Sequence, residues 1–170
     1  MTGVRAPLVV GLSRRLGTST LAAALHATDG GLLAPGTAGE ADIVLCLADE
    51  PTLRHVALLA CAPTGPRPVL VVAGAAAPVR AGGFGAVVAL PHVRRWAGAP
   101  DARGEAAAAL AFPPEELPHD VAAYAAALHG LVHALTGSQL LRRSAPPLVS
   151  RPVTGGLWRG LRVGAAGRVP

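Results

Sequence analysis

Short apolar runs alternate along the chain with stretches whose apolar positions repeat at helical spacing. The runs are rich in Val, Leu and Ala and are bounded by Gly or Pro, a pattern typical of buried parallel strands. The predicted strands are residues 8–12, 42–47, 68–73 and 85–90, and the predicted helices are residues 18–27, 51–62 and 119–136. This alternation predicts an α/β fold, a doubly wound and mostly parallel sheet with flanking helices.

Two segments interrupt the alternation. Residues 29–39 are rich in Gly, Ala and Thr and are predicted to form a loop, since residues 28–41 are too few for two strands and their connections. Residues 97–118 carry three prolines around an alanine-rich patch, residues 105–111, which is expected to form about two helical turns.

The length of 170 residues suggests one small domain. The composition is 51% hydrophobic with only 3% aromatic residues, which implies an aliphatic core. We assign residues 1–136 to the α/β domain and residues 137–170 to an extended or disordered tail. No acidic residue follows Asp120, so the tail is basic through six arginines: Arg142, Arg143, Arg151, Arg159, Arg162 and Arg168.

The basic tail could contact nucleic acid, an anionic membrane surface or an acidic patch on a partner protein. Trp158 is its only aromatic ring, which disfavours a base-stacking nucleic-acid platform. Apolar residues among the arginines, such as Leu157 and Leu161, favour docking on a protein partner over the other two. A solvated arm without a partner is the remaining alternative.

The residues between the first strand and the first helix, Gly11-Leu-Ser-Arg-Arg-Leu-Gly-Thr-Ser-Thr20, have the outline of a phosphate-binding P-loop. In the ordinary spacing Gly17 is the second glycine, Thr18 replaces the lysine, and Ser19 keeps the position of the magnesium ligand. All 15 basic residues are arginine, so no lysine is available for phosphate anywhere in the chain.

Arginines stand where variants of this loop usually have glycine. The Arg14 and Arg15 guanidinium groups could supply some of the missing charge, but from a different place, so binding could persist while turnover fails. The candidate phosphate-binding residues are Ser13, Arg14, Arg15, Gly17, Thr18, Ser19 and Thr20.

The string G-x5-G-T-S-T-L-A-A-A-L resembles the loop and first helix of the MinD/ParA superfamily, and more narrowly its CpaE/TadZ branch, which serves Tad pilus assembly and secretion. Residues 41–54 resemble a later strand and helix start of that family, and the resemblance covers about residues 5–136. It implies ATP or ADP with magnesium, Ser19 as metal ligand, and action through a protein partner or through dimerisation.

Family members normally carry acidic strand ends, which this chain lacks, unless Asp49 substitutes for one; the alternative is that Asp49 only begins a helix. The favoured function is a noncatalytic or weakly nucleotide-binding protein for positioning or scaffolding. The alternatives are a minimal ATPase using Arg14 or Arg15 with Asp49, and a nucleotide-free interaction module.

The remaining chemistry-bearing residues give weaker signals. His129 and His133 share a helix face, but no acid or cysteine completes a metal site. The segment from His92 to Trp96 follows a strand end and either contacts a phosphate or nucleobase or forms a solvated basic helix. Cys46 and Cys61 lie in apolar runs, so both are expected to be reduced core residues. With no signal peptide or membrane span visible, a cytoplasmic protein is expected.

Overall fold

The computed structural model describes residues 4–75, 79–152 and 162–163. Five parallel strands form the central sheet in the order β2-β1-β4-β6-β8. Their bounds are Leu8–Gly11 (β1), Thr28–Leu32 (β2), Ile43–Leu47 (β4), Val69–Ala73 (β6) and Ala86–Leu90 (β8). The four apolar runs therefore form parallel strands, as predicted, and the α/β class is confirmed.

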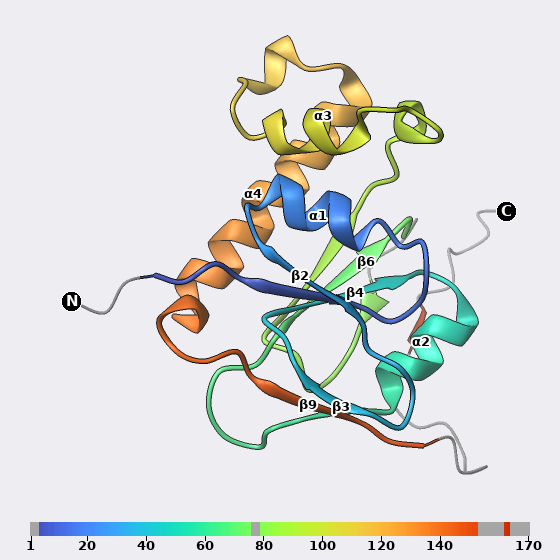
Figure 1. Cartoon of the computed structure of the whole chain (residues 1–170), viewed down its shortest axis with the longest axis vertical. Helices are drawn as coiled ribbons and strands as arrows, with labels where there is room; N and C mark the ends of the chain where they lie inside the picture. The colour runs from blue at the N-terminus through green and yellow to red at the C-terminus, as the bar shows by residue number, and fades with distance from the viewer. Residues whose placement is uncertain (1–3, 76–78, 153–161, 164–170) are drawn as a thin grey trace, which may run out of the picture.

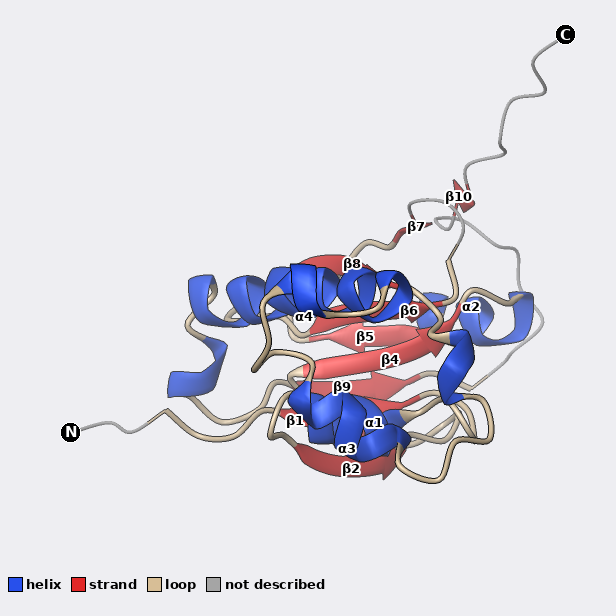
Figure 2. Cartoon of the chain, turned by 90° about the horizontal axis from the view of Figure 1, so that it is seen from above, coloured by secondary structure: helices blue, strands red, loops and turns tan. Residues whose placement is uncertain are grey.

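Alternate strand residues enter two separate cores, one on each face of the sheet. Ile43, Leu45 and Val71 point to the face covered by α1 (Thr18–Ala24), α3 (Ala102–Ala108) and α4 (His119–Gly137). Val44 and Val72 point to the other face, where they pack against α2 (Glu50–Ala57). Figures 1 and 2 show these layers. Both faces are buried, which explains why the strands are continuous apolar runs rather than alternating ones.

A small antiparallel sheet lies beyond the α2 face, with the order β3-β9-β5. Its strands are Ala38–Glu40, Pro147–Ser150 and Leu59–Cys61. β9 belongs to the segment after residue 136 that the sequence predicts to be an extended or disordered tail, and its Leu148 is fully buried in the α2-side core. Of the rest of that tail, residues 153–161 and 164–170 lie outside the described residues, and β10 (Arg162–Val163) pairs with β7 (Val79–Arg80).

The prediction of a loop over residues 29–39 is wrong, because β2 and β3 both lie within residues 28–41. Every residue of β2 is exposed, and the strand runs along the edge of the sheet, so it carries no apolar pattern. The edge position also removes the need for a long connection, since β2 follows α1 and pairs directly with β1. The two helical turns expected over residues 105–111 are α3, which begins and ends three residues earlier.

Two of the predicted helices are shorter in the structure. α1 ends at Ala24, and α2 ends at Ala57 because the following residues form β5. The last helix, α4, agrees with its prediction within one residue. Within the described part of the chain, no helix combines the length and hydrophobicity that a membrane crossing requires.

An ion pair between a buried carboxylate and a half-buried arginine lies at the start of the sheet. Asp42, directly before β4, is fully buried, and its carboxylate accepts hydrogen bonds from Arg5 at 2.6 and 2.7 Å and from the Leu8 amide at 2.8 Å. The pair joins the chain before β1 to the chain before β4, and so sets the register of the two central strands.

Candidate functional site

The loop of residues 12–17, which joins β1 to α1, lies at the carboxyl end of the sheet where the strand order reverses. β1 pairs with β2 on one side and with β4 on the other, and such a switch point is the usual ligand site of an open α/β sheet. Leu12 and Leu16 anchor the loop in the two opposite cores, while Arg14 and Arg15 are exposed. The leucines therefore hold the loop in place and leave its arginines facing solvent.

Two glycines are required by this loop. Gly17 precedes α1 with φ +79°, in the left-handed region where a side chain is strained. A Cβ on Gly11 would lie 2.5 Å from the Thr18 Oγ1, so a side chain at position 11 would displace the Thr18 hydroxyl. Thr18, at the position of the expected lysine, thus packs over the end of the strand.

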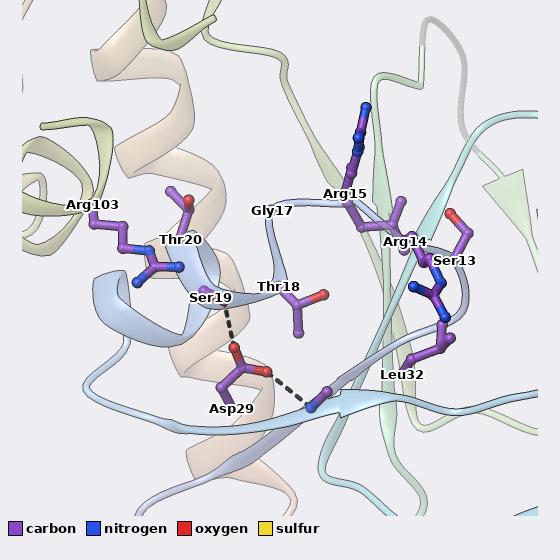
Figure 3. A pocket seen from close by; sticks show the side chains of 12 residues that line it. Ser13, Arg14, Arg15, Gly17, Thr18, Ser19, Thr20, Asp29, Leu32 and Arg103 are labelled. Carbon is purple, nitrogen blue, oxygen red and sulfur yellow. Dashed lines mark hydrogen bonds between the residues drawn. The ribbon is translucent and has the colours of Figure 1, made fainter. Parts of the chain in front are cut away.

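A pocket of about 580 Å³ opens beside the loop (Figure 3). It contains all seven candidate phosphate-binding residues of the loop and adds residues from β2 and α3. The lining residues are Ser13, Arg14, Arg15, Leu16, Gly17, Thr18, Ser19, Thr20, Asp29, Gly31, Leu32 and Arg103. Three guanidinium groups and one carboxylate give the lining a positive balance, which suits an anionic ligand.

The Ser19 hydroxyl donates a 2.6 Å hydrogen bond to one carboxylate oxygen of Asp29 on β2, and the other oxygen accepts from the Gly31 amide at 2.9 Å. The hydrogen bond from Ser19 lowers the pKa of Asp29 most, followed by that from Gly31, and the positive charge of Arg103 lowers it further. A carboxylate held ionised in this way is a weak base but a good oxygen ligand for a cation.

Asp29 was not identified from the sequence, because site acids were expected only at strand ends, whereas Asp29 is the second residue of β2. The miss follows from the loop prediction, since the acid lies on an edge strand without apolar residues. The available signal was Asp29-Gly30-Gly31 immediately after the first helix. A Cβ on Gly30 would lie 2.9 Å from the Val10 Cγ1 and 3.0 Å from both the Leu8 Cδ1 and the Val9 carbonyl oxygen, which explains the glycine.

Arg103 is the second residue that the sequence did not identify. It lies on α3, far along the chain from the loop, and its guanidinium enters the pocket beside Ser19 and Thr20 (Figure 3). Nothing in the local sequence marks it, because its place depends on how α3 packs over α1.

Asp49 lies elsewhere. Its Oδ1 accepts a 2.9 Å hydrogen bond from the Thr52 amide and caps α2, and Asp49 is not among the 12 residues that line the pocket. Asp49 therefore begins a helix, as the alternative reading of the sequence predicted. Glu50, in the first turn of α2, forms an ion pair with Arg54. The acid beside Ser19 is Asp29 instead.

A second, mostly apolar hollow of about 380 Å³ adjoins the pocket and shares Arg15, Leu16, Gly17 and Thr20 with it. It lies at the carboxyl ends of β4, β6 and β8. Its other lining residues are Leu45, Leu47, Ala73, Gly74, Leu90, Pro91, His92, Val93, Trp96, Ala97, Ala102 and Tyr124. The hollow is large enough for a flat ring or a short apolar group.

Trp96 is the anchored residue of this hollow. Its ring meets that of Tyr124 edge to face at 4.8 Å, and its Nε1 donates a 2.8 Å hydrogen bond to Glu105. Burial raises the pKa of Tyr124, so its hydroxyl stays neutral. His92 also lines the hollow, whereas Arg95 pairs with Glu105 at 3.4 Å.

The other titratable residues do not assemble a metal centre. In the described ranges, no three His, Cys, Asp or Glu side chains group where a metal ion could be held. The His129 Nδ1 donates to the Ala125 carbonyl within α4 at 2.9 Å. Cys46 is buried, as expected of a core residue, whereas Cys61 is only half-buried, and neither is in a disulfide.

A buried histidine connects this loop to the small sheet. The ring of His55, on α2, hydrogen-bonds the backbone of Leu12, and its Nε2 lies 2.8 Å from the Ser150 hydroxyl of β9. Burial lowers the pKa of His55, so the ring is held neutral. The loop is thereby braced from behind through a residue that is 6% exposed.

Comparison with protein-family models, with curated proteins and with solved structures found no match to this chain.

Proposed function

We propose that this chain is a weakly nucleotide-binding, noncatalytic P-loop protein of the MinD/ParA type. One observation carries the proposal: the Ser19 hydroxyl lies against the Asp29 carboxylate in a pocket that also holds three arginines and no lysine. Hydroxyl and carboxylate oxygens are the ligands that magnesium prefers, and guanidinium groups bind phosphate. The expected ligand is ATP or ADP with magnesium.

The fit of this ligand rests on the donor set of the described residues. Ser19 and Asp29 would hold the metal ion, which would neutralise phosphate charge, and Arg14, Arg15 or Arg103 would contact phosphate oxygens. The adjoining hollow beside Trp96 is suited to the base, since it is apolar and continuous with the pocket at Gly17. The loop lacks the fixed ammonium that stabilises charge during phosphoryl transfer, which argues for binding without turnover.

The cellular role in this proposal follows the family resemblance. A CpaE/TadZ-like protein would act in the cytoplasm in positioning or scaffolding a pilus or secretion assembly, through a protein partner or through dimerisation. The exposed edge strand β2 is a surface available for such contacts, and the arginines of the predicted tail would add positive charge to them. Contact of the tail with an anionic membrane or nucleic acid is the weaker form of this proposal.

Substitution of Asp29 tests the metal part of the proposal, because it should change the affinities for Mg²⁺–ATP and for metal-free pyrophosphate in opposite directions. Asp29→Asn removes a cation ligand, so we expect Mg²⁺–ATP to bind about tenfold more weakly. The same change removes a negative charge from the pocket, so metal-free pyrophosphate should bind more tightly. Isothermal titration calorimetry measures both affinities.

Glu115→Gln is the matched control, since it removes one exposed carboxylate on η2 (Pro114–Glu116), outside the pocket lining. We expect it to change either affinity by less than about twofold. If Asp29→Asn changed both affinities in the same direction, or matched Glu115→Gln, the metal role of Asp29 would be refuted.

The minimal ATPase remains the second candidate, because Arg103 together with Asp29 supplies a cation and an acid that the loop sequence alone lacks. It predicts phosphate release that vanishes in Ser19→Ala. The nucleotide-free interaction module instead predicts that Gly17→Ala alters stability and leaves partner binding unchanged.

A further inference from the structure

We propose that Arg103 supplies the phosphate-binding positive charge that the loop lacks because Thr18 stands at the lysine position. α3 would thus contribute a ligand-binding side chain to the site. This inference rests on the proposed function. The ligand it addresses is the phosphate chain of a diphosphate or triphosphate. The assignment rests on how the three arginines of the pocket are placed around Ser19 and Asp29.

The two loop arginines are badly placed for this task. Figure 3 shows the Arg15 side chain pointing away from the Ser19–Asp29 pair, and Arg14 beside Ser13 across the pocket from Arg103. Arg15 also takes positive φ, +61°, and borders the apolar hollow as well as the pocket. Arg103 instead approaches Ser19 and Thr20 directly.

The Arg103 guanidinium is close enough to Asp29 for its charge to lower the pKa of that carboxyl. Within the described ranges it makes no hydrogen bond or close ion pair, so its five N–H donors are available to a ligand. A phosphate bound between Arg103 and a cation at Asp29 would meet opposite charge on two sides.

The backbone that carries Arg103 is fixed by packing. Ala106 and Ala109 are buried against the core beneath α1, and Glu105 accepts the hydrogen bond from Trp96, whose ring meets Tyr124 of α4. Arg103 is therefore held two residues from an anchored side chain. A fixed backbone limits the freedom that the Arg103 side chain loses on binding.

Affinity for inorganic pyrophosphate and for Mg²⁺–ATP, measured by calorimetry on the full chain, tests this assignment. We expect Arg103→Gln to weaken both about tenfold, the loss typical of one charge-assisted hydrogen-bonding group. Arg103→Lys keeps the charge and should recover part of the affinity. The matched control is Arg67→Gln, which removes an exposed arginine that does not line the pocket and should change affinity less than twofold.

Thermal unfolding of each variant checks that the fold is retained. If Arg103→Gln does not fold, the affinity of Arg103→Lys is compared with that of the wild type instead. Equal affinities for Arg103→Gln and Arg67→Gln would overturn the assignment while leaving the proposed function intact. A larger loss in Arg14→Gln or Arg15→Gln than in Arg103→Gln would assign the charge to the loop instead. Absence of binding by the wild-type chain at millimolar ligand would refute the proposed function and this inference together.

Discussion

The ion pair between Arg5 and Asp42 gives the sharpest prediction about stability. Asp42 is fully buried and accepts three hydrogen bonds, two from Arg5 and one from the Leu8 amide, whereas the Arg5 side chain is 31% exposed. Arg5→Met therefore leaves a buried carboxylate with one amide partner, and should lower the free energy of unfolding by about 3–4 kcal/mol. Asp42→Leu should cost about 2–3 kcal/mol, because the freed Arg5 can regain water while the Leu8 amide loses its acceptor.

The double variant separates the pair from its parts. With both charges gone, the remaining cost is the unpaired Leu8 amide and imperfect packing, about 1–2 kcal/mol, which is well below the sum of the two single changes. Urea unfolding followed by circular dichroism measures all three values, and a loss of 3 kcal/mol should also lower Tm by roughly 6–12 °C in a domain of this size. Additive single costs, or a cost for Arg5→Met below about 1 kcal/mol, would refute the account of the pair.

Three further predictions concern the loop and the residues behind it. Burial lowers the pKa of His55, so the folded state resists protonation of this ring. The free energy of unfolding should therefore be retained above the unfolded pKa of 6.5 and fall as the pH drops below it. Urea unfolding at several pH values should show a smaller fall of this free energy for His55→Gln than for the wild type. Burial raises the pKa of Cys46 to about 12, so a thiol reagent should modify half-buried Cys61 first and Cys46 only on unfolding, and equal rates would contradict the burial. Gly17→Ala should lower the free energy of unfolding by about 1 kcal/mol through its positive φ, and a neutral result would contradict that loop geometry.

The central sheet was predictable because its strands are buried on both faces. Residues 69–73 and 43–47 read as continuous apolar runs for that reason, and the order of elements followed from their alternation with helices. The edge strand β2 was not predictable in the same way, since all five of its residues are exposed and two are glycine. Its position comes from pairing with β1, a long-range contact that leaves no local periodicity.

In the candidate site, too, local features could be predicted from the sequence and long-range contacts could not. The loop residues Ser13 to Thr20 could be identified because their spacing between a strand and a helix is local. Asp29 and Arg103 could not, because one lies on the unpredicted edge strand and the other is brought to the pocket by packing of α3 over α1. Asp49 is the opposite case: its local sequence fitted both a site residue and a helix cap, and in the structure it caps α2.

Calorimetric titration of Mg²⁺–ATP into the full chain tests the central proposal most directly, because one experiment reports both binding and turnover. We predict saturable heat with a dissociation constant of about 0.1–1 mM, weakened in Ser19→Ala, and a baseline that returns to zero after each injection. Sustained heat that disappears in Ser19→Ala would instead identify an ATPase. Absence of saturable heat at millimolar Mg²⁺–ATP would contradict nucleotide binding altogether.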